Sequence, residues 1–175
     1  MNNIKKIVIF KNDAVGDLIQ SLGAINNIIQ NNRNNKILIY LSERSKNFDF
    51  FFKFDNVEIK VVNYDLTFFQ KIQILLYLLR SSTHLIYILT PKNFYFYLPL
   101  LFRKIRFYGL CIESTNNYKR PSIFLRKHLY KFVINNRATK LKRPSTIELQ
   151  KELTSDLYYK HKFLLNYIPK FSFID

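Results

Sequence analysis

The chain is poor in the residues that build many common ligand sites. Its 175 residues include one cysteine, Cys111, three glycines and three histidines. A single thiol excludes an internal disulfide and is consistent with a reducing compartment, and the scattered His84, His128 and His161 give no metal-binding cluster. The sequence has neither a Gly-x-Gly-x-x-Gly fingerprint nor a Walker lysine motif, which disfavours a dinucleotide or P-loop site.

A hydrophobic run long enough to cross a membrane is also missing. The most apolar region, residues 85–102, is interrupted by Thr-Pro-Lys-Asn at 90–93. Each half is shorter than the roughly 20 apolar residues that span a bilayer. The N-terminal MNNIKKIVIF has two lysines but only a short apolar run, so we expect no signal peptide.

Acidic residues are scarce and basic residues are unevenly placed. The chain has 28 Lys and Arg against 12 Asp and Glu, and residues 100–143 alone hold 12 basic residues and one acidic residue. A concentrated positive charge attracts nucleic acid, phosphorylated lipid or an acidic membrane surface. The alternative interpretation is that the positive charge reflects a general richness in Lys and Asn, and that the basic face is only solvated and binds no partner. The 48% apolar content is typical of a globular domain with a real core.

What the sequence does contain is an alternation of apolar strands and amphipathic helices. We predict strands at 6–10, 36–41, 57–62, 84–89 and 105–110, the last closed by Gly109. We predict helices at 17–31, 66–81 and 94–104, and a short aromatic helix or loop beginning at Ser42 as a cap.

Two further helices are expected in the C-terminal part of the chain. One begins near Pro121 and has apolar positions as far as Val133, and another runs from about Pro144 to Tyr159. Ser145 and Glu148 have the spacing of a capping box. The whole pattern predicts an α/β fold, with a single Rossmann-like domain at 1–143 and a C-terminal helical segment at 144–175. The domain would hold a parallel sheet of about five strands with helices on both faces.

The loop after the first strand, in the stretch FKNDAVGDL at 10–18, carries the main candidate site. Ligands of open α/β sheets bind beyond the carboxyl ends of the strands, where this loop lies. Gly16 either lets a ligand or backbone approach closely or supplies a turn dihedral closed to other residues. Asp17 falls in the first helical turn, where the helix dipole favours an ionised carboxylate. That carboxylate could act as a general base, and a purely structural role is the alternative.

The same stretch resembles the N-terminal signature of the heptosyltransferase-like glycosyltransferases of family 9. The matching features are the apolar strand, Lys11, Asp13, the pair Gly16-Asp17 and the apolar helix start. The resemblance covers about residues 4–112, including the fourth strand and the basic fifth strand. The chain departs from the family at Gly23, where a proline is usual, and at Tyr87, where an Asp is frequent. Enzymes of this family have two domains, and the sugar-nucleotide site lies mostly in the C-terminal domain, which has no counterpart here.

The resemblance implies one half of a GT-B architecture in an inverting glycosyltransferase that needs no metal and no cofactor. Asp17 would be the general base in transfer of a heptose-type sugar from a nucleotide-diphosphate donor to an acceptor of the lipopolysaccharide-core type. Gly16 and Asp13 would contribute to the acceptor site, Asp13 as a turn or positioning residue. The candidate contacts to acceptor phosphates are Lys11, Arg44, Lys46, Arg103, Lys104 and Arg106.

The partners implied are a phosphorylated glycolipid acceptor, a separate donor-binding domain and an anionic membrane surface. We therefore expect a cytoplasmic protein, peripheral on the inner membrane face and inactive without a donor domain. The alternative function is a non-catalytic basic domain that binds anionic glycolipid or membrane. Nucleic-acid binding ranks third, because the sequence has no recognised nucleic-acid motif.

Overall fold

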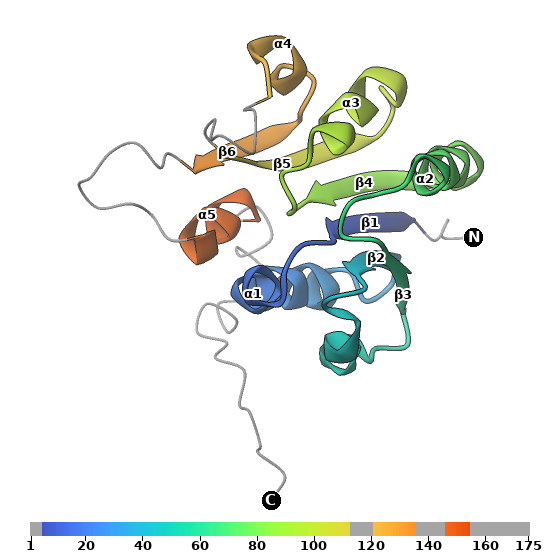
Figure 1. The fold of residues 1–175 in the computed structure, drawn as a ribbon, viewed down its shortest axis with the longest axis vertical. Coiled ribbons are helices and arrows are strands. Elements are labelled where there is room, and N and C mark those ends of the chain that lie inside the picture. The colour runs from blue at the N-terminus through green and yellow to red at the C-terminus, as the bar shows by residue number, and fades with distance from the viewer. Residues whose placement is uncertain (1–4, 113–120, 136–145, 155–175) are drawn as a thin grey trace, which may run out of the picture.

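A parallel sheet forms the centre of the molecule (Figure 1). The computed structural model describes residues 5–112, 121–135 and 146–154. Within them the sheet has six strands in the order β3-β2-β1-β4-β5-β6, and every neighbouring pair is parallel. The strands are β1 (Lys6–Lys11), β2 (Lys36–Ser42), β3 (Val57–Val62), β4 (Thr83–Ile88), β5 (Arg106–Ile112) and β6 (Lys131–Asn135). The predicted Rossmann-like α/β fold is confirmed.

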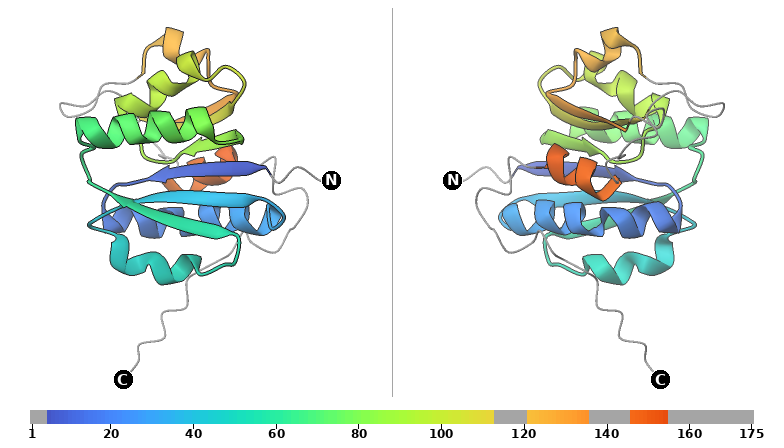
Figure 2. Two further views of the ribbon diagram at one scale, coloured as in Figure 1. Left: turned by 90° about the vertical axis from the view of Figure 1, so that its right-hand side faces the viewer. Right: turned by 90° about the vertical axis from the view of Figure 1, so that its left-hand side faces the viewer.

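Helices cover both faces of this sheet, as the two views of Figure 2 show. They are α1 (Val15–Asn31), the 3-10 helix η1 (Lys46–Phe52), α2 (Phe68–Arg80), α3 (Asn93–Leu101), α4 (Ile123–Arg126) and α5 (Thr146–Leu153). Successive strand residues point to opposite faces, so Ile7 and Ile9 pack with α1, η1 and α5. Val8 and Phe10 pack with α2, α3 and α4. Strands buried on both faces explain the unbroken apolar runs in the sequence.

The chain after Pro121 differs from the prediction. A helix was expected as far as Val133, but α4 ends at Arg126 and β6 follows. The backbone gives the reason: β5 offers a free edge, and the pairing from Tyr108 with Lys131 to Ile112 with Asn135 satisfies its hydrogen-bonding groups. The sheet therefore gains a sixth strand that the helical spacing of the apolar residues had concealed.

Gly109 lies inside β5 and does not close it, contrary to the prediction. A Cβ atom at this position would lie 3.0 Å from Leu129 Cδ1 and 3.2 Å from Phe96 Cε1. Both neighbours are buried, so the glycine lets β5 pack closely against the segment after α4.

The helix α5 lies beyond the predicted domain boundary at residue 143, yet it packs on the sheet and on α1. Leu149 and Leu153 are buried in the same core as the apolar side of α1. The buried Gln150 donates its Nε2 hydrogen to Ser21 Oγ of α1 at 2.8 Å. The predicted Ser145–Glu148 capping box and the extension of this helix to Tyr159 lie outside the described residues.

Candidate functional site

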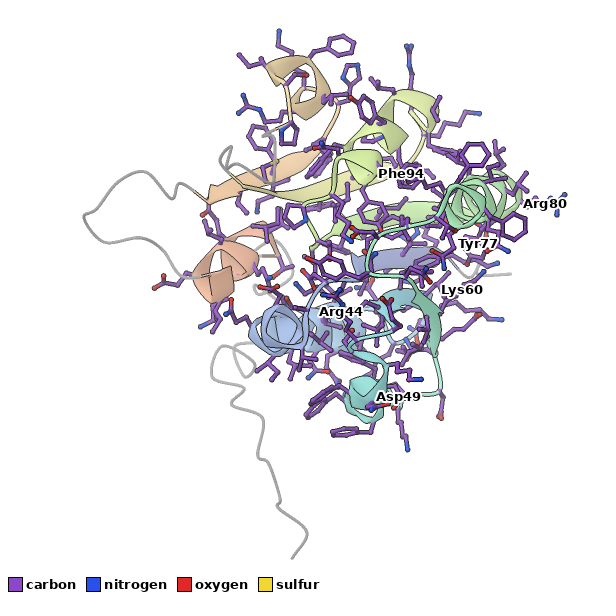
Figure 3. The ribbon with its side chains drawn as sticks, in the orientation of Figure 1. Arg44, Asp49, Lys60, Tyr77, Arg80 and Phe94 are labelled. Atoms are coloured by element: carbon purple, nitrogen blue, oxygen red, sulfur yellow. The ribbon has the colours of Figure 1, made fainter. Side chains whose placement is uncertain are left out.

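The candidate site lies at the carboxyl edge of the sheet, where β1 and β4 are neighbours. From β1 the chain continues outward to β2 and β3, and from β4 it continues to β5 and β6 on the other side. This reversal of strand order is the switch point at which open α/β sheets bind ligands. Figure 3 labels Arg44 on the β2 side of this edge and Phe94 on the β4 side.

The floor of the site is built from the residues that follow β1. Asn12 is fully buried and donates to the carbonyl oxygens of Asn63 at 3.1 Å and Tyr64 at 3.2 Å. Its Oδ1 accepts from the hydroxyl of Tyr95 at 2.7 Å. Burial raises the pKa of Tyr95 well above its ordinary value, so that hydroxyl keeps its proton and remains a donor. Asn12, which sequence reasoning did not single out, thus ties β1 to the end of β3 and to α3.

Lys11 and Asp13 form an internal ion pair beneath this floor. Lys11 Nζ lies 2.7 Å from Asp13 Oδ2, and the lysine side chain is only 1% exposed. Burial raises the pKa of Asp13, and the charge of Lys11 opposes that shift. The structure therefore places the Lys11 side chain inside the protein. Its charge is paired with the Asp13 carboxylate and does not face an approaching phosphate.

Ser42 also belongs to the floor and does not cap a helix. It is the last residue of β2, and its Oγ donates to the carbonyl oxygen of Asp13 at 2.7 Å. The predicted cap at Ser42 is wrong because η1 begins only at Lys46, after a further turn. This bond holds the β1–α1 loop against the end of β2.

Asp17 is exposed above the floor, in the first turn of α1. Ala14 stands at the N-cap and offers no side-chain acceptor, so the first amide groups of the helix lack a capping side chain. The Asp17 carboxylate has no hydrogen bond or ion pair with another residue in the part of the chain that the structure describes. Its charge is close enough to raise the pKa of Asp13. Asp17 is thus a solvent-facing carboxylate that a ligand could reach.

Gly16 is exposed beside Asp17 and is already helical. Its backbone does not adopt the left-handed conformation, and an added Cβ atom would meet nothing within 4 Å. Of the two roles considered for Gly16, the special turn dihedral is excluded. Close approach of a ligand remains a prediction.

Two cations flank one aromatic ring at the same edge. The guanidinium carbon of Arg44 lies 4.2 Å from the centroid of the Tyr64 ring, and Lys92 Nζ lies 4.0 Å from it. Lys92 also lies 3.4 Å from the exposed Asp65 carboxylate. Burial lowers the pKa of Lys92, and Asp65 opposes that shift. Sequence reasoning missed Lys92, although its place just after the fourth strand put it at this edge.

The remaining predicted cations fall into two groups. Lys46 is exposed at the start of η1, two residues after Arg44, and so belongs to the carboxyl edge. Arg103, Lys104 and Arg106 precede or begin β5, which places them at the opposite, amino edge of the sheet. The structure therefore does not bring these three together with Asp17. No group of three or more His, Cys, Asp or Glu among the described residues is placed to hold a metal ion.

Comparison with solved structures supports the fold. A glycosyl transferase family 9 structure from Veillonella parvula matches with a TM-score of 0.60 and 15% identity, over 87% of this chain and 41% of that chain. The E. coli heptosyltransferase WaaC matches with TM-scores of 0.46 with ADP and 0.45 with ADP-2-deoxy-2-fluoro heptose. The identities are 11% and 10%, over 86% of this chain and 46% and 47% of those chains.

The match to the family 9 structure from Veillonella parvula confirms the predicted resemblance at the level of the fold. The chain has the α/β fold found in a family 9 glycosyltransferase and spans less than half the length of each matched structure. No family model and no curated protein matches the sequence.

Proposed function

We propose that this chain is the acceptor-binding half of an inverting glycosyltransferase, with Asp17 as its general base. The donor would be a nucleotide-diphosphate sugar of the heptose type, and the acceptor a phosphorylated sugar of the lipopolysaccharide-core type. The observation that carries the proposal is the position of Asp17: an exposed carboxylate in the first turn of α1, at the switch point of the sheet. The shared fold supports it.

In the proposed reaction Asp17 accepts the proton of an acceptor hydroxyl. The oxygen of that hydroxyl forms a bond to the anomeric carbon of the donor sugar, and the bond between that carbon and the diphosphate oxygen breaks. The nucleotide diphosphate leaves with the bonding electrons, and the configuration at the anomeric carbon inverts. A second domain, corresponding to the part of the family 9 structure that this chain does not cover, would bind the donor and its leaving group.

Arg44, Lys92 and Lys46 are the proposed contacts for acceptor phosphates, since they lie at the same edge as Asp17. The Tyr64 ring lies against both Arg44 and Lys92, so their positions are coupled. Lys11 and Asp13 would act as positioning residues, because their buried pair holds the loop that presents Asp17.

The test is Asp17→Asn, which removes the base and keeps the size of the side chain. We expect transfer of radiolabelled sugar to a lipid-free phosphorylated core oligosaccharide, measured with a donor-binding domain supplied, to fall about 100-fold or more. Binding of the oligosaccharide to the chain alone, measured by calorimetry, should change less than about twofold. Asp49→Asn is the matched control, because Asp49 is an exposed carboxylate on η1, apart from Arg44 in Figure 3.

Unchanged transfer in Asp17→Asn would overturn the role of Asp17 as general base. Oligosaccharide binding without transfer by the wild type, even with a donor domain, would favour the second candidate, a non-catalytic glycolipid-binding domain. The observation behind that candidate is the group of cations at the carboxyl edge, Arg44, Lys92 and Lys46, which could hold an acceptor phosphate without catalysis. Failure of the oligosaccharide to bind to the wild-type chain would overturn both candidate functions, the glycosyltransferase half and the non-catalytic binding domain.

A further inference from the structure

The helices α2, α3 and α4 expose apolar side chains on the surface that faces away from the sheet. Of the 14 large hydrophobic residues that are exposed in the described part of the chain, nine lie on these helices or on the adjoining edge strand β6, so the exposure is concentrated on one side. We call this surface the outer face. Its apolar members are Phe68, Phe69, Leu76, Leu79, Tyr97, Leu101, Ile123, Phe124 and Phe132.

The exposure of these side chains follows from the helical period. In α2, Ile74 and Leu78 point to the core, whereas Phe68, Phe69 and Leu79 are 79%, 67% and 70% exposed. A surface helix of a globular protein ordinarily presents polar residues on its outer side. Exposed apolar surface that gathers on one side of a protein marks an interaction site, and the exposed side chains of α2, α3 and α4 lie on one side of the sheet.

The described segments that carry α2, α3 and α4 have charges of one sign. The described residues from Leu66 to Ile112 and from Pro121 to Asn135 include nine Lys and Arg and no Asp or Glu. Five of these cations, Arg80, Arg103, Lys104, Arg106 and Lys127, are exposed. Figure 3 shows Arg80 pointing outward from the end of α2. The nine carboxylates of the described residues all lie in other segments of the chain.

We propose that the outer face docks on the surface of an anionic lipid bilayer. Aromatic and leucine side chains would enter the boundary between headgroups and acyl chains, and the cations around them would contact anionic headgroups. A second copy of the chain is a poorer occupant, because a symmetric dimer would bring together two surfaces whose described helices α2, α3 and α4 carry cations and no carboxylate.

Docking would also place the candidate site close to the lipid. The helix α2 starts at the carboxyl edge of the sheet, where the Gln70 side chain bonds to Asn63 at 3.1 Å. Phe68 and Phe69 belong to this first turn and therefore lie at the same edge as Asp17. A glycolipid acceptor could then reach the site while it stays anchored in the bilayer. This consequence rests on the proposed function, whereas the docking itself does not.

The experiment is flotation of the full chain with vesicles of phosphatidylcholine, either alone or with about one third phosphatidylglycerol. We expect binding to the anionic vesicles that weakens as salt is raised, and little binding to the neutral ones. F68S/F69S and R103E/K104E should each weaken binding by about tenfold or more.

Two matched controls lie off the outer face. R33E/K53E changes the net charge by the same amount as R103E/K104E, at exposed positions after α1 and η1. Phe50→Ser removes an exposed phenylalanine from η1. Both controls should bind anionic vesicles within about twofold of the wild type, and thermal unfolding would confirm that all variants are folded.

Absence of binding to anionic vesicles would overturn the proposal, as would an equal loss of binding in R33E/K53E. A wild-type dimer in sedimentation that F68S/F69S converts to a monomer would also overturn it, by showing that a second copy occupies the face. None of these outcomes bears on the assay of Asp17, because that assay uses an acceptor without lipid.

Discussion

At the scale of the residue, the three glycines of the chain have different reasons to be glycine. Gly23 lies within α1, where a Cβ atom would meet nothing within 4 Å, whereas the same atom at Gly109 would crowd Leu129 and Phe96. Gly16 has the open surroundings of Gly23 but lies beside Asp17. The sequence alone could not separate them, because the spacing of glycines says nothing about what surrounds each one in the fold.

Alanine substitutions at Gly23 and at Gly109 should therefore have opposite effects on the free energy of unfolding. Gly23→Ala should raise the free energy of unfolding by about 0.5–1 kcal/mol, because alanine favours the helix. Gly109→Ala should lower it by about 1–3 kcal/mol through overpacking. Denaturant unfolding measures both. A Gly109→Ala variant as stable as Gly23→Ala would show that Leu129 moves aside freely.

Gly16→Ala separates stability from binding at the candidate site. It should stabilise the fold by about as much as Gly23→Ala, because both positions are helical and open. If an acceptor approaches the backbone there, its affinity for the phosphorylated oligosaccharide should fall about tenfold. Unchanged affinity in calorimetry would mean that no ligand comes close to Gly16.

At the scale of the element, strands buried on both faces were the easiest part to predict. Strands β1 to β4 start and end within one residue of their predicted bounds, because unbroken apolar runs mark β1, β2 and β4, and alternation of apolar and charged residues marks the more exposed β3. β6 was missed because its short run follows apolar residues at helical spacing, and only the free edge of β5 decides its conformation. Local pattern cannot report a partner that lies elsewhere in the chain.

The helix α5 should prove to be part of the core. Leu153→Ala removes a fully buried side chain and should cost about 2–5 kcal/mol of unfolding free energy. Ile147→Ala, on the same helix but 44% exposed, should cost less than about 0.5 kcal/mol. Equal, small effects in denaturant unfolding would mean that α5 does not stay docked on α1 in solution.

At the scale of the whole molecule, the basic residues are divided between two ends of the sheet. The sequence predicted one set of phosphate contacts, and the structure separates Arg44 and Lys46 from Arg103, Lys104 and Arg106. The neighbouring positions of Asp13, Gly16 and Asp17 could be predicted because one loop carries them all. Lys92 and Tyr64 come from two other loops, and only the strand order brings them to Arg44.

This division predicts that two double variants will have opposite defects. R44Q/K92Q should weaken binding of the lipid-free phosphorylated oligosaccharide about tenfold or more and leave vesicle binding nearly unchanged. R103Q/K104Q should weaken vesicle binding and leave oligosaccharide binding within about twofold. Calorimetry and flotation measure the two properties on the same preparations. If either double variant abolished both oligosaccharide binding and vesicle binding, that result would contradict the proposal that separate sets of cations carry the two functions.

The contact between α1 and α5 joins two segments that are made far apart in time. Gln150 and Ser21 are 129 positions apart, and the ribosome releases α1 first. The side of α1 that Leu149 and Leu153 will cover has no partner until α5 leaves the exit tunnel. During that interval the part of α1 that α5 later covers stays exposed, and transiently exposed apolar surface makes a partly synthesised chain prone to aggregation.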